Sequence, residues 1–244
     1  MVPLLLLLNS CQKNEKEIVQ QANFSQVEKR NANCFDNSIE DICPNQTIKL
    51  DTLVLDSIPG YPVGCTFTIE YEFVDCQYIG FPNLYSYVIG DFNILDINCH
   101  KYEVDIDSIM MNLGIGSQTM ADYMAGLYRK LVERTSEVVF TTYYKHLFDC
   151  TDTNNNLFTL SWIKASCERY CFVKPIGKGF YIGYPVECGT GCCITFIDLC
   201  WDSTLNKVVK IITTQQASSG ECESPSSEPP GFCTLSSNCS FTCE

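Results

Sequence analysis

Hydrophobic and polar residues alternate over long stretches of the chain. In the clearest run, Phe67, Ile69, Tyr71 and Phe73 are separated by single polar residues, and a similar run covers residues 48–55. Alternation with a period of two, built from aromatic and β-branched residues, is typical of half-buried antiparallel strands. The same pattern predicts further strands over residues 84–89, 102–106, 138–144, 158–165, 193–201 and 207–215. The last two form a hairpin through the polar turn at 202–206.

One segment has a helical period instead. Its apolar residues recur at intervals of three and four: Met120, Tyr123, Met124, Leu127 and Leu131. This spacing predicts an amphipathic helix over 117–135, with Thr119 and Asp122 as a capping box at its start. We expect the methionine-rich face to pack against a sheet as core rather than to form a partner groove. The predicted fold is therefore α+β and mainly β, with antiparallel sheets and one amphipathic helix.

The chain contains a short internal echo. Residues 60–65 match residues 183–188 at five of six positions, and each copy precedes a strand that ends in cysteine. We favour two related β modules, at 34–116 and 136–216, bridged by the helix. The alternative is one sheet that uses the same aromatic-proline turn twice. Residues 217–244 are rich in Ser, Pro and Gly but hold four cysteines, so they are expected to form a cross-linked tail.

The cysteine count predicts a disulfide-rich body. The chain has seventeen cysteines, and setting Cys11 aside leaves sixteen that can pair completely. These are Cys34, Cys43, Cys65, Cys76, Cys99, Cys150, Cys167, Cys171, Cys188, Cys192, Cys193, Cys200, Cys222, Cys233, Cys239 and Cys243. No Cys-x2-Cys knuckle is present, so disulfides outside the cytoplasm are favoured over zinc. The neighbours Cys192 and Cys193 should bond to different segments, since adjacent strand residues face opposite ways.

The N-terminus carries features that resemble targeting signals. Residues 1–10 fit a signal peptide whose start lies in a longer precursor, and Leu8-Asn9-Ser10-Cys11 resembles a bacterial lipobox. The charged run at 12–17 resembles an export signal, and four Asp-Ser/Thr triplets at 51–53, 56–58, 107–109 and 202–204 resemble O-glycosylation signals. All of these resemble features of cysteine-rich surface lipoproteins of Bacteroidota.

The resemblance implies a lipid on Cys11, a flexible tether over residues 11–33 and a lipid-anchored location in the outer membrane, at the cell surface. A secreted eukaryotic protein is the alternative. It is favoured by N-glycosylation patterns beginning at Asn23, Asn45 and Asn238.

The net charge of the chain and its motif content limit the classes of function that the sequence supports. The formal charge is −13, from 29 acidic and 16 basic residues without a basic cluster, which argues against nucleic acid binding. The only histidines are His100 and His146, and no nucleophile elbow, phosphate loop or metalloprotease helix occurs. We therefore expect no cofactor and no metal. A pair of carboxylates for hydrolysis has no local signature in a sequence.

The aromatic residues near the Gly-Pro turns offer the remaining functional signal. Tyr61, Phe81 and Tyr184 are candidate binding residues, because aromatic faces stack on sugar rings or on protein side chains. We expect a surface-anchored lipoprotein that acts as a non-catalytic binding or adhesion module for extracellular glycan or protein. The alternatives are a secreted hydrolase with an acidic residue pair hidden in the tertiary structure, and a structural envelope protein.

Overall fold

The computed structural model describes most of the chain beyond residue 46. The described residues are 34, 47–77, 85–151, 157–165, 167–189, 191–218, 233–236, 239–241 and 243. All of them belong to one compact unit, Asn33–Glu244. Cys11, the lipobox and the tether predicted from the sequence lie outside the described residues, as do Phe81 and the three candidate N-glycosylation asparagines.

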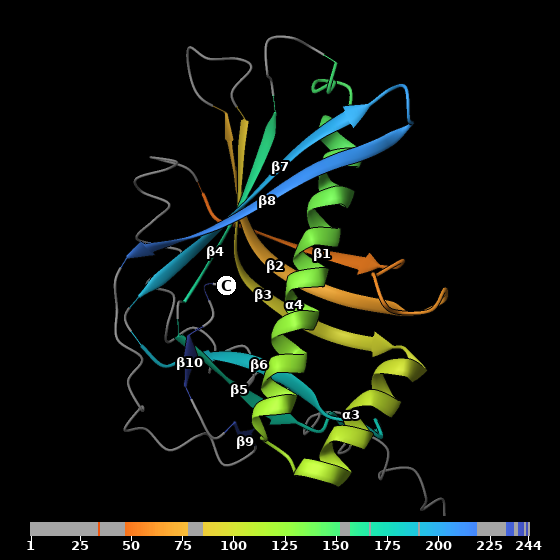
Figure 1. Cartoon of the computed structure of the whole chain (residues 1–244), viewed down its shortest axis with the longest axis vertical. Helices are drawn as coiled ribbons and strands as arrows, with labels where there is room; N and C mark the ends of the chain where they lie inside the picture. Colours follow the sequence, from red (N-terminus) through yellow and green to blue (C-terminus); the bar gives the residue numbers. More distant parts are fainter. Residues whose placement is uncertain are drawn as a thin grey trace, which may run out of the picture. The chain divides into compact units, whose positions relative to one another are not determined.

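A six-stranded sheet forms the larger part of this unit (Figure 1). Its order is β1-β2-β3-β4-β7-β8, with bounds β1 Lys49–Leu55, β2 Thr66–Gln77, β3 Tyr85–Asn98, β4 Phe158–Ala165, β7 Cys192–Asp202 and β8 Lys207–Ser218. Neighbouring strands are antiparallel except β3 and β4, which are parallel. The alternating runs predicted β1, β2, β4 and the β7–β8 hairpin within a few residues.

A smaller sheet has the order β10-β5-β6, and β9 also pairs with β5. Its strands are β5 Cys167–Val173, β6 Ile182–Glu187, β9 Thr234–Leu235 and β10 Ser240–Phe241. All of its pairs are antiparallel. Two short strands of the C-terminal tail therefore complete the edge of this sheet beside β5.

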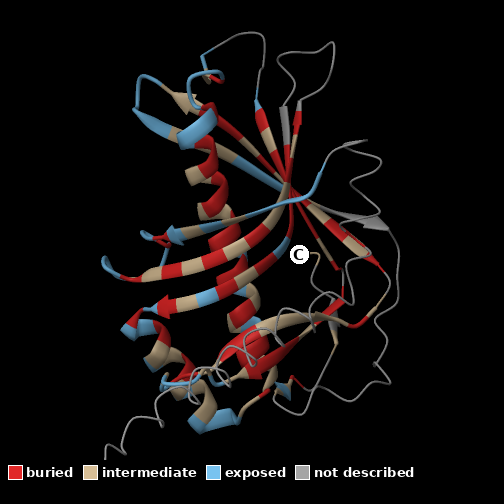
Figure 2. Ribbon diagram, turned by 180° about the vertical axis from the view of Figure 1, so that it is seen from behind, coloured by how far each residue is buried: buried red, intermediate tan, exposed pale blue. Residues whose placement is uncertain are grey.

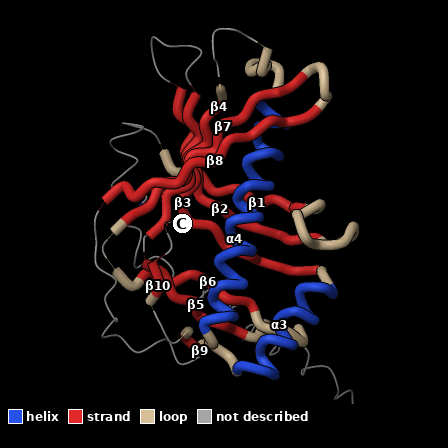
Figure 3. Tube along the Cα trace, viewed as in Figure 1, coloured by secondary structure: helices blue, strands red, loops and turns tan. Residues whose placement is uncertain are grey.

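Two helices follow β3: α3, His100–Leu113, and α4, Gln118–Val139, which continues into a π-helical turn, η2, Phe140–Tyr144 (Figure 3). The predicted helix is confirmed and extends beyond its expected C-terminus. Its N-cap is Ser117 rather than Thr119, because the Ser117 hydroxyl accepts the backbone N–H of Met120 at 3.4 Å.

Helix α4 packs against strands of both sheets, namely β1 and β7 of the larger one and β5 of the smaller one. Its buried stripe includes Met120, Met124, Leu127 and Leu131, as the helical period predicted. The helix packs closely over Gly183 of β6. A Cβ at this position would lie 2.7 Å from the Phe172 ring and 2.8 Å from the Met124 side chain. The expectation of a core face is confirmed.

The main core lies between α4 and the face of the large sheet that α4 covers, called the inner face here (Figure 2). Phe67, Ile69 and Tyr71 of β2 are buried in it. A smaller cluster, which includes Val74, Val88 and Ile163, lies on the opposite, outer face, because neighbouring strand residues point to opposite sides.

Two predicted strands were wrong. Residues 102–106 belong to α3, and residues 138–144 form the end of α4 and η2. The first segment fits both periods, but Tyr102 and Ile106 are buried while Val104 between them is 51% exposed, which is a helical pattern. The second error arose because the β-branched residues at 138–142 favour strands only weakly against helix packing.

The two predicted β modules share one sheet, since β3 of the first pairs with β4 of the second. The two copies of the internal echo also differ in conformation. Residues 60–65 form a turn-rich loop between β1 and β2, whereas residues 183–187 lie inside β6. The same sequence is therefore used once as a connection and once as a strand.

Six disulfides connect described residues: Cys34–Cys192, Cys65–Cys99, Cys150–Cys200, Cys171–Cys233, Cys188–Cys239 and Cys193–Cys243. Cys76 and Cys167 are disulfide-bonded as well, so every cysteine in the described ranges is oxidised. Disulfides in such numbers are rare in the cytosol, and they indicate an extracytoplasmic protein.

Candidate functional site

A small groove opens between α4 and the inner face of the large sheet, with a volume of about 80 Å³. We call it the α4–β8 groove. It is lined by Arg129, Val132 and Glu133 of α4, Trp162 of β4, Thr195 and Ile197 of β7, and Ile212 and Thr214 of β8. An indole ring, two hydroxyls, a guanidinium and a carboxylate therefore line the same groove. Ligand-binding sites commonly combine apolar and polar groups in this way.

The register of three strands builds the floor of the groove. Trp162 lies opposite Thr195, and Thr195 lies opposite Thr214, so the three side chains form one row across β4, β7 and β8. The hydroxyls of Thr195 and Thr214 are 3.1 Å apart and hydrogen-bonded. The adjacent row on the same face is apolar and ends in Ile197 and Ile212. The floor therefore changes from apolar to hydroxyl-bearing over two residues along β7 and β8.

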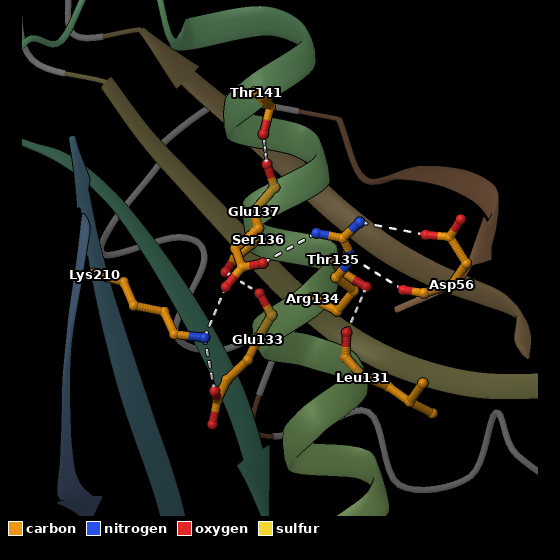
Figure 4. A network of polar contacts seen from close by, with 9 residues as sticks. All are labelled: Asp56, Leu131, Glu133, Arg134, Thr135, Ser136, Glu137, Thr141 and Lys210. Carbon is orange, nitrogen blue, oxygen red and sulfur yellow. Dashed lines mark hydrogen bonds and ion pairs between the residues drawn. The ribbon is translucent and has the colours of Figure 1, made fainter. Parts of the chain in front are cut away.

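Charged residues at four-residue intervals form the wall on α4. Arg129, Glu133 and Glu137 lie on the same side of the helix. Lys210 of β8 reaches across to this side and donates to Glu133 Oε2 at 3.0 Å and to Glu137 Oε1 at 2.8 Å (Figure 4). Burial lowers the pKa of Lys210, but the bonds to Glu137 and Glu133 outweigh burial, so its pKa is raised and it stays charged.

The same network continues over the helix toward β1. Arg134 donates to Glu137 Oε2 at 3.1 Å and, on its other side, to the Asp56 carboxylate at 3.3 Å and the Asp56 backbone carbonyl at 3.1 Å (Figure 4). Asp56 directly follows β1. One chain of ion pairs therefore links the two outermost strands of the large sheet to α4 and fixes the helix that forms the groove wall.

A second polar group lies at the junction of the two sheets. Lys164 Nζ lies 5.2 Å from the centre of the Trp162 ring and 3.4 Å from Glu168 Oε2. Glu168 of β5 stands directly opposite Glu187 of β6. Burial, together with the charges of Asp91 and Glu168, raises the pKa of Glu187 to about 7. This is an acidic pair that the sequence did not identify, and neither member lines the groove.

Two of the aromatic residues predicted to bind a ligand, Tyr61 and Tyr184, pack against other residues of the protein. Tyr61 packs edge-on against Phe67 with ring centres 5.2 Å apart, and its hydroxyl lies 2.9 Å from that of Tyr123. Tyr184 also packs against the main core. The groove residues were not singled out from the sequence. The signal was present in the strand alternation, which puts Trp162 on the same face of β4 as Phe158 and Leu160 of the main core.

Within the described residues, no group of three or more His, Cys, Asp or Glu side chains is placed to hold a metal ion. No helix in the same part of the chain has the length and apolar character to cross a membrane. Comparisons of the chain with family models, curated proteins and solved structures give no match.

Proposed function

We propose that this chain is a non-catalytic binding module that is anchored to the outer cell surface by a lipid on Cys11. Its ligand is extracellular glycan or protein, and the α4–β8 groove is its binding site. The observation that carries the proposal is the row of Trp162, Thr195 and Thr214 beside Arg129, which combines an apolar ring with hydrogen-bonding groups.

The size of the groove favours binding over catalysis. Its volume of about 80 Å³ is well below the roughly 300–1,000 Å³ of pockets that enclose a whole small molecule. A groove of this size accommodates one residue of a larger ligand, while the rest of that ligand stays on the surface. A polymer such as a glycan or polypeptide meets this condition.

The surface location is supported by two features of the body. The oxidised cysteines fit an environment outside the cytoplasm. The hydroxyl-bearing residues of the four candidate O-glycosylation triplets, Thr52, Ser57, Ser108 and Ser203, are all exposed. Intact-mass measurement of the native protein, with and without reductant, tests the anchor. An unmodified Cys11 or many free thiols contradicts it.

Binding is tested with arrays of glycans and extracellular proteins. Thr214→Trp places a large ring in the groove, while Thr52→Trp makes the same change on exposed β1 at the other edge of the sheet. We expect Thr214→Trp to abolish binding and Thr52→Trp to retain it. Equal binding by both variants rules out the groove.

The acidic pair supports a second candidate function, a hydrolase. Glu187, with a pKa of about 7, is protonated in about half of the molecules at neutral pH, while its partner Glu168 is paired with Lys164. Such an arrangement provides a general acid beside a carboxylate. Polysaccharide or peptide hydrolysis that is lost in Glu187→Gln, with folding intact, favours this candidate over the binding module.

A further inference from the structure

We propose that the α4–β8 groove binds an N-acetylated sugar residue of a glycan, and that the acetamido group of this residue is the part that enters the groove. This inference rests on the proposed binding function and specifies the class of ligand. Three properties of the groove support it: its small volume, its adjoining apolar and hydroxyl-bearing rows, and the balance of the charges around it.

The groove suits a small substituent better than the flat face of a sugar ring. Its volume of about 80 Å³ holds several water molecules, or an acetamido group that displaces them. Trp162 lines the groove but is only 8% exposed, and Lys164 Nζ lies 5.2 Å from the centre of its ring. The indole therefore offers an edge to a small group rather than a platform for stacking. The sugar residue is held by its substituent, while the rest of the glycan stays on the surface.

The two rows of the groove floor match the two parts of an acetamido group. Ile197 and Ile212 form the apolar row, and the hydroxyl-bearing row lies two residues along the strands, about 7 Å away. The acetyl methyl group packs on the apolar row, and the amide reaches the hydroxyls. Thr195 and Thr214 share one hydrogen bond of 3.1 Å, which leaves the pair one hydroxyl hydrogen for the amide carbonyl and lone pairs for the amide N–H.

Arg129 on the helix wall adds a donor for the same carbonyl, since a guanidinium carries five N–H groups. Other neutral groups fit this combination less well. A sugar hydroxyl has no methyl group for the apolar row, and the side chains of asparagine and glutamine end in a polar NH₂ group instead. A main-chain amide of a polypeptide is flanked by chain on both sides, so it does not enter a groove of this size end-on.

The charges around the groove favour a neutral ligand. Lys210 donates to both Glu133 and Glu137, so these carboxylates are already paired (Figure 4). Together with Arg129, the cations beside the groove balance the carboxylates. An ammonium group on a sugar would lose its hydration beside the apolar row without gaining an unpaired carboxylate. A polyanionic glycan would be repelled by the formal charge of −13. A neutral N-acetylated glycan avoids both costs.

The experiment titrates the full-length, oxidised chain with tetrasaccharides that share one backbone and differ in a single substituent on each sugar. Chitotetraose carries acetamido groups, cellotetraose carries hydroxyls, and the glucosamine tetramer carries ammonium groups. We expect calorimetry to give chitotetraose a dissociation constant about tenfold or more below those of the other two, with little dependence on salt. Saturation-transfer NMR should give its strongest signal at the acetyl methyl protons.

Matched variants locate the contact. Thr214→Val removes a hydroxyl from the groove and keeps the shape of the side chain, so it should raise the dissociation constant for chitotetraose about fivefold. Arg129→Met should weaken binding in the same direction. Thr213→Val makes the same change as Thr214→Val at an exposed position on the outer face of β8, and it should leave affinity within about twofold.

Each other outcome overturns the inference. If cellotetraose or the glucosamine tetramer binds as tightly as chitotetraose, or if Thr214→Val binds as tightly as the native chain, the groove does not recognise the acetamido group. If a different glycan or a protein binds and Thr214→Trp abolishes that binding, the proposed function stands and the class of ligand is wrong. If nothing binds in a groove-dependent way, both proposals fail.

Discussion

Cys192 and Cys193 are adjacent in β7, yet they are bonded to segments near opposite ends of the sequence: Cys192 to Cys34 and Cys193 to Cys243. A shift in the β7–β8 register falls between the two cysteines. Their side chains leave the strand on opposite faces, so the N-terminal and C-terminal segments are both fixed at one point of the sheet. The expectation that these neighbours bond to different segments is confirmed.

Removing the C-terminal link should weaken the smaller sheet. The double variant Cys193→Ser with Cys243→Ser should lower the free energy of unfolding by about 2–4 kcal/mol, because the open chain gains conformational freedom. Limited proteolysis should then release the end of the tail first. The matched pair Cys34→Ser with Cys192→Ser should cost a similar amount but leave the tail protected. Equal tail cleavage in both pairs would contradict the assigned connectivity.

Two glycines beside the same helix should respond in opposite directions to alanine. Gly183→Ala places a methyl group against Phe172 and Met124 and should destabilise the protein by about 1–3 kcal/mol. Gly126→Ala, in α4 with no atom within 4 Å of the added carbon, should stabilise it by about 0.5–1 kcal/mol. Denaturant unfolding of both variants measures the difference. A stabilising Gly183→Ala would mean that α4 does not pack closely on β6.

The sequence predicted those parts of the fold in which one local period dominates. β2 has a clear alternation and α4 a clear helical stripe, and both were found. Residues 102–106 satisfy both periods, so the choice depended on packing that the sequence does not display. The parallel pairing of β3 with β4 joins residues far apart in the chain, and no local pattern encodes such a contact.

The candidate site was harder to predict from the sequence, because its residues come together only through the pairing of the strands. Trp162, Thr195 and Thr214 come from three strands, and only the pairing of those strands puts them in a row. The opposed Glu168 and Glu187 have the same origin. The disulfide count followed from the composition, whereas the connectivity required the positions of the strands.

The ion pairs of Lys210 should matter mainly for the position of α4. Lys210→Met leaves Glu133 and Glu137 facing each other one helical turn apart, and we expect a loss of about 1 kcal/mol that shrinks in high salt. Lys207→Met changes an exposed lysine on the same strand and should cost less. Thermal unfolding at low and high ionic strength tests this. A loss that is independent of salt would indicate a packing effect of the Lys210 stem.

Glu187 should make the body less stable as the pH rises toward neutrality. Its pKa is about 7 in the folded protein against an ordinary pKa of 4.5 for a glutamate, so between these values the folded state keeps a proton that the unfolded chain has lost. The contribution is therefore complete below about pH 4.5 and disappears as the pH rises through about 7. Burial is the main cause, followed by the charges of Asp91 and Glu168, while Lys164 on Glu168 moderates the repulsion.

Replacing Glu187 by glutamine tests this sign directly. After solvent screening we expect about 1–2 kcal/mol between pH 5 and pH 8 in the native sequence, and little of that difference in Glu187→Gln. Melting temperatures across this range provide the measurement, with Glu70→Gln, on β2 of the other sheet, as the matched control. Because the glutamine has no proton to lose, Glu187→Gln should be the more stable protein at pH 8. A variant that is less stable than the native sequence at pH 8 would show that ionised Glu187 has a stabilising partner, and that the opposed carboxylates do not repel.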